Sequence, residues 1–370
     1  MLKRLHLRNF TVFADAEFEF GDGLNVLVGT NGTGKTHVLK AGYAAKIAQN
    51  DASSFLESAA AANMPDFELR DTTAWILSLR QALQDVFLLY EGIDSIVKRG
   101  AKKADINVSF DSFADKASFQ IKSKDIISGQ TGSIVMNSEG VPLTQAMGSP
   151  RFVLIPAKEV LTLGWLPAVY DRYQKGDIRI DRTYPDVIRL LLGPSLRHPE
   201  PAYVVENLVK LIGGKVEEDG GRFYLATPEQ SRLEMNLVAE GMRKFATLYK
   251  LLANGTLTPE TTLFWDEPEA NLNPALLKEM AVILTDLGQA GFQIILATHS
   301  LFLMRELHIL AQQKKKPVRY FGLYKGEEGD VRVERQDDLM QLQHITALDA
   351  ELAQTFDFEA ALDEEYAGDN

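Results

Sequence analysis

The stretch Gly29-Thr30-Asn31-Gly32-Thr33-Gly34-Lys35-Thr36 decides the fold of this 370-residue chain. The apolar run 24–28 before it is typical of a buried strand, and residues 37–45 after it are typical of a helix. A glycine-rich loop that ends in Lys-Thr between a strand and a helix is the context that a phosphate-binding loop requires. A chance glycine turn would rarely carry both the complete pattern and these flanks, so we expect the loop to bind phosphate.

The chemistry of phosphate binding accounts for the residue types in this loop. Glycines let backbone amides turn inward and form a nest for anionic oxygens, and the helix N-terminus adds unpaired amides. Lys35 can reach the β- and γ-phosphates of a nucleotide, and the Thr36 hydroxyl can bind Mg²⁺. The predicted nucleotide-binding residues here are Gly29, Asn31, Gly32, Thr33, Gly34, Lys35 and Thr36.

The composition excludes several classes of protein. The chain has no cysteine, which rules out disulfides, thiolate metal sites and a cysteine nucleophile. Its net charge of −12 gives no support to nucleic acid as a partner, although a local basic patch stays open. No apolar run has the length of a bilayer-spanning helix, and the first residues lack a signal-peptide core. We therefore expect a cytoplasmic protein with no membrane partner.

Apolar patterns along the chain predict an α/β fold with a mainly parallel sheet, because strands alternate with helices. The expected strands are 2–9, 16–20, 24–28, 105–110, 117–122, 133–137, 151–155, 262–265, 292–297, 318–324 and 330–334, with a hairpin at 214–225. The expected helices are 37–45, 71–90, 159–173, 184–192, 203–212, 237–252 and 274–287. The three strands from 105 to 137 are expected to form an antiparallel β subdomain.

Two acids follow a predicted strand downstream of the loop. The run 262–265 is apolar, and Asp266 and Glu267 come directly after it. Asp266 is expected to hold Mg²⁺, and Glu267 is expected to be the general base for an attacking water. Adjacent acids at a strand end can also serve only as turn or capping residues, but their place after a phosphate loop favours catalysis.

Motifs at both ends of the chain carry a resemblance to a known family. LKRLHLRNFTVFADAEFEF is similar to that family's first hairpin, and LFWDEPEANLNP to its Walker B strand and D-loop. LVAEGMRKFATL resembles its signature motif, and IILATHS resembles the strand that carries its switch histidine. The family is the ABC-type ATPase head of the SMC, RecF and OLD class, in the branch of stand-alone bacterial AAA-family ATPases. The resemblance covers about residues 1–45 and 235–305.

The resemblance implies a P-loop NTPase with an ABC-ATPase-like head that hydrolyses ATP, with ATP and Mg²⁺ bound. Two heads would close head to tail, each nucleotide lying between one phosphate loop and Gly241 of the other signature. His299 would be the switch histidine, and the Thr-His-Ser context favours this role over that of a capped histidine at a strand end. Implied partners are a second copy of the chain, as an ATP-dependent homodimer or larger oligomer, and a separately encoded effector, as in anti-phage defence systems.

Two positions depart from the family pattern. Ala239 aligns with the signature serine that contacts the γ-phosphate of the partner's nucleotide. The Q-loop glutamine is absent, and Lys158 or Glu159 occupies its region within RFVLIPAKEVL. Without the serine, backbone amides at the helix N-terminus must make the contact between subunits.

Other functions stay open. A DNA-repair or recombination ATPase would need a long coiled coil or a basic surface, and neither is visible. A transporter ATPase would carry the LSGGQ signature, which EGMRK replaces. A non-hydrolysing ATP-dependent scaffold agrees with Ala239, but intact Lys35, Asp266, Glu267 and His299 favour hydrolysis.

We expect four parts in the chain. Residues 1–157 would form the first ATPase lobe with the antiparallel β subdomain, and 158–232 an inserted helical arm with a hairpin. Residues 233–348 would form the second lobe, with the signature, Walker B, D-loop and switch histidine. Residues 349–370 contain eight acids and no Lys or Arg, which is typical of a solvated helix or tail.

Overall fold

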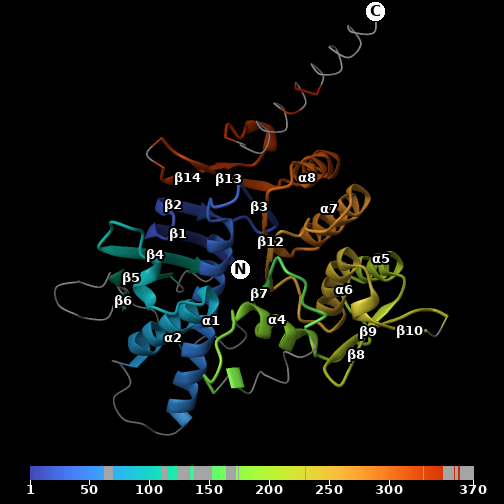
Figure 1. The fold of residues 1–370 in the computed structure, drawn as a ribbon, viewed down its shortest axis with the longest axis horizontal. Coiled ribbons are helices and arrows are strands. Elements are labelled where there is room, and N and C mark those ends of the chain that lie inside the picture. Colours follow the sequence, from blue (N-terminus) through green and yellow to red (C-terminus); the bar gives the residue numbers. More distant parts are fainter. Residues whose placement is uncertain are drawn as a thin grey trace, which may run out of the picture.

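The computed structural model describes most of the chain (Figure 1). The described residues are 1–61, 70–110, 116–122, 134–136, 152–163, 172–173, 175–229, 231–327, 329–344, 354 and 357–358. The predicted break at 63–65 and nearly all of the acidic tail lie outside them. Among the described helices, none combines the length and the apolar character needed to cross a bilayer.

One sheet of eleven strands organises the fold, in the order β6-β5-β4-β1-β2-β14-β13-β3-β12-β11-β7 (Figure 1). Its parallel half consists of β3 (Leu24–Val28), β7 (Phe152–Ile155), β11 (Thr262–Asp266), β12 (Gln293–Thr298) and β13 (Arg319–Lys325). β12 pairs in parallel with both β3 and β11. These strands are nearly continuous apolar runs, as expected for strands that are buried on both faces.

The other half of the sheet is mainly antiparallel. It contains β1 (Leu2–Phe10), β2 (Phe13–Glu19), β4 (Lys103–Phe110), β5 (Lys116–Lys122), β6 (Ile134–Met136) and β14 (Val331–Gln336). On β1, buried Leu5 and Leu7 alternate with exposed Arg4 and Arg8, so one face packs on the core. The predicted first hairpin, the antiparallel pairing of β4, β5 and β6, and the closing hairpin are confirmed.

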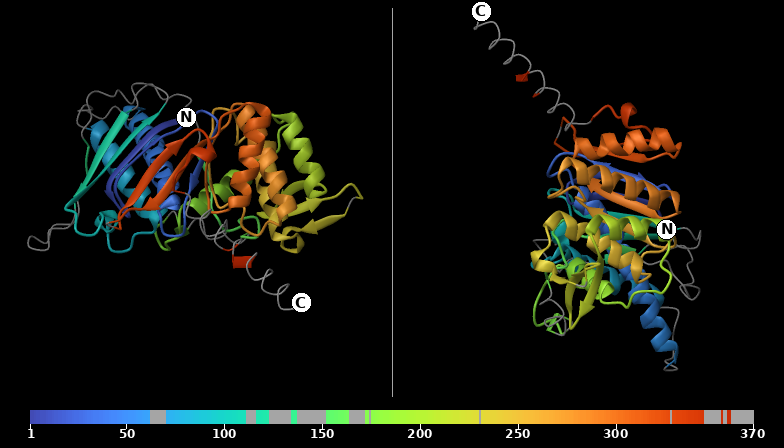
Figure 2. Two further views of the ribbon diagram at one scale, coloured as in Figure 1. Left: turned by 90° about the horizontal axis from the view of Figure 1, so that it is seen from above. Right: turned by 90° about the vertical axis from the view of Figure 1, so that its right-hand side faces the viewer.

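Helices cover both faces of the parallel half (Figures 1 and 2). α1 (Lys35–Ala61) lies on one face, with α2 (Arg70–Phe87) beside it against β6 of the antiparallel half. α6 (Glu240–Ala253), α7 (Pro274–Gln289) and α8 (Leu301–Lys314) lie on the other face. Each face of the sheet has its own apolar core. Successive strand residues point to opposite faces, so on β11 Phe264 belongs to the core on the α1 side and Trp265 to the core on the α7 side. The two cores together fix the strand that ends in Asp266.

A smaller unit packs beside α6. It consists of α4 (Thr183–Leu191), α5 (Ala202–Ile212) and a three-stranded sheet of β8 (Lys215–Asp219), β9 (Arg222–Ala226) and β10 (Arg232–Glu234). Leu208 of α5 and Leu248 of α6 belong to one buried cluster. The β9–β10 end of the small sheet extends away from the body (Figure 2, left). The predicted division into two lobes and an arm stays a prediction.

Three details differ from the sequence prediction. Residues 159–163 form a turn and no helix, because the Glu159 carboxylate accepts hydrogen bonds from the backbone N–H of Leu161 and from the Thr162 hydroxyl. Most of the rest of the predicted helix 159–173 lies outside the described residues. α6 begins at Glu240, after a short 3₁₀ turn at Met235–Leu237. Helix α8 and strand β10 were not anticipated.

Further 3₁₀ turns lie at Ile93–Ile96 and Leu339–Gln341.

Gln293 joins three strands at the end of the sheet opposite the loop. Its amide nitrogen donates to the carbonyl oxygens of Leu2 and Gly21, at 2.7 and 2.9 Å. Its amide oxygen accepts from the backbone N–H of Leu2 at 2.9 Å and from the hydroxyl of Thr262 at 2.6 Å. The side chain is fully buried, so these groups have no access to water as a substitute partner.

We predict that Gln293→Leu lowers the free energy of unfolding by about 2–4 kcal/mol, because several buried polar groups lose their partner at once. Urea unfolding followed by circular dichroism measures this difference. Gln289→Leu is the matched control, since the same change at an exposed position should stay within about 0.5 kcal/mol of the parent. Equal unfolding free energies for Gln293→Leu and the parent would contradict the role of this residue.

Candidate nucleotide-binding and catalytic site

The glycine loop connects β3 to α1 and has the backbone that its glycines permit. Gly32 and Gly34 have φ of +81° and +86°, in the left-handed region that favours glycine. A Cβ on Gly29 would lie 2.5 Å from the carbonyl oxygen of Leu323 and 2.7 Å from the hydroxyl oxygen of Thr33. Only glycine fits at position 29 without displacing the loop, whereas Asn31 is exposed at its tip.

Lys35 and Thr36 begin α1 and point into the loop and toward β11. The Lys35 ammonium donates to the carbonyl oxygens of Gly29 and Thr30, at 2.7 and 3.1 Å. The Thr36 hydroxyl donates to Asp266 Oδ2 at 2.8 Å, across 230 residues of sequence. Burial lowers the pKa of the Lys35 ammonium, and the nearby carboxylates, chiefly that of Glu267, oppose this effect.

Asp266 is a buried carboxylate, and only one of its two oxygens is hydrogen-bonded within the described residues. Its Oδ1 has no hydrogen-bond partner among the described residues, while Oδ2 accepts from Thr36. Burial raises the pKa of the Asp266 carboxyl, and the Thr36 hydrogen bond lowers it in part. The free oxygen and the Thr36 hydroxyl are the hard oxygen ligands that Mg²⁺ prefers, so these residues suit that cation.

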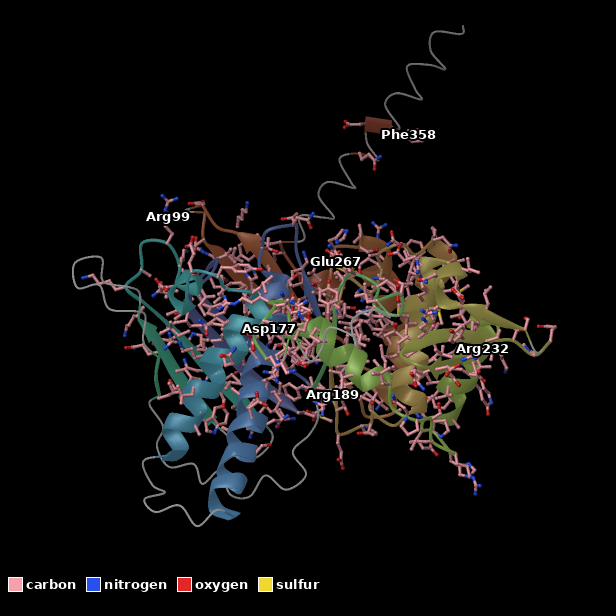
Figure 3. The ribbon with its side chains drawn as sticks, turned by 60° about the horizontal axis from the view of Figure 1, so that its bottom comes forward. Arg99, Asp177, Arg189, Arg232, Glu267 and Phe358 are labelled. Atoms are coloured by element: carbon pink, nitrogen blue, oxygen red, sulfur yellow. The ribbon has the colours of Figure 1, made fainter. Side chains whose placement is uncertain are left out.

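Glu267 follows in a conformation that few residues adopt. Its φ is +47°, although it has a side chain and precedes a proline. Its N–H donates to the carbonyl oxygen of Ala297 on β12 at 2.9 Å. Glu267 lies near the centre of the molecule in Figure 3. Backbone strain of this kind is concentrated at functional sites, where the surrounding structure enforces it.

His299 lies beside the predicted general base. Its Nδ1 is 3.4 Å from Glu267 Oε1 and 3.4 Å from Glu269 Oε1. Glu269 Oε1 also accepts from the Thr298 hydroxyl at 2.6 Å and from the His299 N–H at 3.0 Å. Glu269 therefore fixes the end of β12. Glu269 has no role that its sequence context predicts, although it is the third acid in the run DEPE.

The predicted signature and D-loop are in contact within one chain. Asn271 Nδ2 donates to Glu240 Oε1 at 2.8 Å, and Asn271 has φ of +63°. A Cβ on Gly241 would lie 2.9 Å from the Asn271 carbonyl oxygen and 3.0 Å from Leu272 Cδ2. The glycine thus permits a close approach of α6 to the D-loop. Its nearest neighbours lie in this D-loop, and not in the chain's own phosphate loop.

The two positions that depart from the family pattern also have defined surroundings. Ala239 is exposed at the N-cap of α6 and gives the helix no side-chain cap. Glu159 is buried in its turn, 3.6 Å from Arg243 Nη1, while Lys158 is exposed. Glu159 is therefore occupied by structural contacts.

Together the loop, the buried acid and the strained glutamate define the class of ABC-type ATPase heads. The chain belongs to the family described as "AAA domain, putative AbiEii toxin, Type IV TA system", whose model matches residues 24–305. A second model, "AAA domain", matches residues 4–41. The family confirms the SMC/RecF-like ATPase head that the sequence motifs indicated.

Curated relatives match over a short stretch. The DNA replication and repair protein RecF of Shewanella loihica is 50% identical over 40 residues, which is 11% of each chain. The RecF protein of Pediococcus pentosaceus is 52% identical over 42 residues, again 11% of each chain. The match thus spans about a tenth of the length of these relatives.

Solved SMC heads align with most of this chain at low sequence identity. An SMC head bound to the C-terminal winged-helix domain of ScpA has a TM-score of 0.51 and 15% identity, covering 92% of this chain and 99% of that one. The SMC head domain from Thermotoga maritima has a TM-score of 0.45 and 14% identity, covering 90% and 98%. The predicted fold class, an α/β P-loop ATPase head with a mainly parallel sheet, is confirmed, and the sheet is mixed because antiparallel strands extend it.

We predict that Asp266→Asn stabilises the protein in EDTA by about 1–3 kcal/mol, because it removes a buried charge with an unpaired oxygen. Thermal unfolding without nucleotide measures this effect. The control is Asp177→Asn, which changes an exposed carboxylate and should leave the melting temperature nearly unchanged. A lower melting temperature for Asp266→Asn than for the parent would contradict this prediction, because the carboxylate would then stabilise the protein in the absence of metal and nucleotide.

Proposed function

We propose that this chain binds and hydrolyses ATP with Mg²⁺ and acts as a conformational switch. The observation that carries the proposal is the hydrogen bond of Thr36 to Asp266, with Asp266 Oδ1 left unpaired one residue before Glu267. The hydroxyl at the end of the phosphate loop and the carboxylate oxygen at the end of β11 could fill two positions of an octahedral Mg²⁺ coordination sphere. Membership in an ATPase family supports nucleotide binding.

Each group has a role that its surroundings favour. Lys35 would exchange its bonds to loop carbonyl oxygens for bonds to phosphate oxygens, since its ammonium already lies inside the loop. Glu267 would accept a proton from the attacking water at its carboxylate, since its side chain is 32% exposed. Bound Mg²⁺ would supply positive charge against the phosphate oxygens. His299, close to Glu267 and held by Glu269, would orient the reacting groups.

We further propose that ATP joins two copies head to tail. Ala239 and Glu240 are exposed at the N-terminus of α6, where free amides and the helix dipole favour an anion such as a γ-phosphate. The hydrogen bond from Asn271 to Glu240 would link this contact at α6 to the D-loop, which contains Asn271. The solved SMC head is bound to a domain of another protein, ScpA, and this supports a separately encoded effector as partner here.

The cellular role we favour is control of such an effector in anti-phage defence. The description of the family, with its mention of an AbiEii toxin and a Type IV TA system, supports this role. A DNA-repair ATPase is the second candidate, because the curated relatives that match 11% of this chain are RecF proteins. Its weakness is the net charge of −12.

Lys35→Ala should lower the affinity for Mg-ATP by roughly 10-fold to 100-fold, because charge-assisted hydrogen bonds to phosphate are lost. Isothermal titration calorimetry measures the affinity, and circular dichroism checks the fold. Lys278→Ala removes an exposed lysine on α7 and should bind as the parent does. Unchanged ATP binding in Lys35→Ala would refute the assignment of the loop.

Glu267→Gln should lower the ATP turnover rate by roughly 10²-fold or more, because the amide keeps the shape and cannot accept the proton. ATP affinity should change little. A phosphate-release assay gives the rate, with Glu260→Gln, an exposed carboxylate, as the control. If Glu267→Gln turns over ATP as fast as the parent, Glu267 is not the general base.

Ala239→Ser in the Glu267→Gln background should tighten ATP-dependent association by about 2–4 kcal/mol per dimer, because each site gains a hydrogen bond to a charged acceptor. Sedimentation velocity with ATP and with ADP measures association. Ala239→Asp is the control, since it caps α6 as serine does but repels a phosphate. A strict monomer with ATP in every variant, also with the partner present, would exclude head-to-tail closure.

A further inference from the structure

A buried lysine connects the signature helix to the predicted general base. Lys244 lies just after the first turn of α6, three residues after Gly241, and is 4% exposed. Its ammonium donates to the carbonyl oxygen of Glu267 at 2.7 Å and to that of Ala157 at 3.4 Å. In the described part of the chain, both of its hydrogen-bond acceptors are backbone oxygens. A buried ammonium needs such acceptors, so this geometry is strongly specified.

The backbone conformation of Glu267 is unfavourable, so contacts from other elements must stabilise it. Its φ of +47° is unfavourable for a residue with a Cβ, and Pro268 restricts the preceding residue further. Pro268 also lacks an N–H, so this peptide offers only its carbonyl oxygen for hydrogen bonding. The Glu267 N–H is held by Ala297 on β12, and the Glu267 carbonyl oxygen is held by Lys244. The backbone on both sides of the glutamate is therefore fixed.

The same ammonium connects three elements at the site. It belongs to α6, it bonds to the peptide that follows β11, and it reaches Ala157, two residues after β7. The carboxylates of Glu269, Glu267 and Glu240 are close enough to attract it electrostatically. A displacement of α6 would therefore change the backbone that carries Glu267.

We propose that Lys244 is a positioning residue, which holds the Glu267 peptide in its strained conformation and couples movement of the signature helix to the general base. This inference rests on the proposed function, because it assigns Lys244 a role through Glu267. Lys244 would not touch ATP. Its loss should therefore affect the chemical step and leave nucleotide binding unchanged.

The test measures kcat and KM for ATP and, separately, the Kd for Mg-ATP. Lys244→Met keeps the apolar stem and removes the ammonium, and we expect kcat to fall by roughly 10-fold to 100-fold, the usual effect of a misplaced catalytic group. KM and Kd should stay within about threefold. Lys244→Arg restores donors at the same place and should recover much of the lost kcat.

Two comparisons separate positioning from general damage to the helix. Lys250→Met makes the same change at another buried lysine of α6, 3% exposed, and should leave kcat near the parent value. In the Glu267→Gln background, Lys244→Met should cause no further loss, because residues that act through one another are not additive.

The outcomes distinguish the two proposals. If Glu267→Gln has no effect, the proposed function itself fails. If Glu267→Gln is slow but Lys244→Met keeps its kcat, only the role of Lys244 fails. Equal losses in Lys244→Met and Lys250→Met, or an additive loss in the double variant, would also overturn this role.

Discussion

The hydrogen bond between the Thr36 hydroxyl and Asp266 Oδ2 joins the two halves of the candidate site. The residues lie 230 positions apart, and only the sheet brings them together. β3 and β11 flank β12 in parallel, so all three strands end at the same edge. The phosphate loop follows β3 there, and Asp266 and Thr298 are the last residues of β11 and β12. Both apolar cores hold these strands, and the position of every site residue depends on them.

The site contains conformations and charges that oppose folding. Glu267 and Asn271 have positive φ, and Asp266 and Glu269 each bury an oxygen without a hydrogen-bond partner among the described residues. Such features persist where the surrounding structure enforces them. Here Lys244, Ala297 and Thr298 supply the enforcing contacts from α6 and β12. We propose that a cation bound beside Thr36 would contact the Asp266 oxygen that has no partner among the described residues.

Local sequence patterns were sufficient to predict most of the fold. β3 and β12 are apolar runs of strand length, and the glycine loop has a defined backbone, so strand, loop and helix followed from the residues. The turn at 159–163 was missed because its cause is one side chain: the Glu159 carboxylate bonds to the turn and competes with helix formation.

The contacts of the site were less predictable. Asp266 and Glu267 could be found from a strand that ends in acids. Glu269 and Lys244 could not be assigned, because their roles depend on contacts with His299 and with a backbone carbonyl 23 residues away. Such contacts exist only once α6, β11 and β12 are packed together.

The central claim is that Thr36, Asp266 and Lys35 together form a site for Mg-ATP. The most direct measurement is a crystal structure of the Glu267→Gln protein with Mg-ATP. We expect the Thr36 hydroxyl and Asp266 to face the cation, and the Lys35 ammonium to leave the carbonyl oxygens of Gly29 and Thr30 for the phosphates. A nucleotide bound elsewhere, with the 2.8 Å bond between Thr36 and Asp266 unchanged, would contradict the claim.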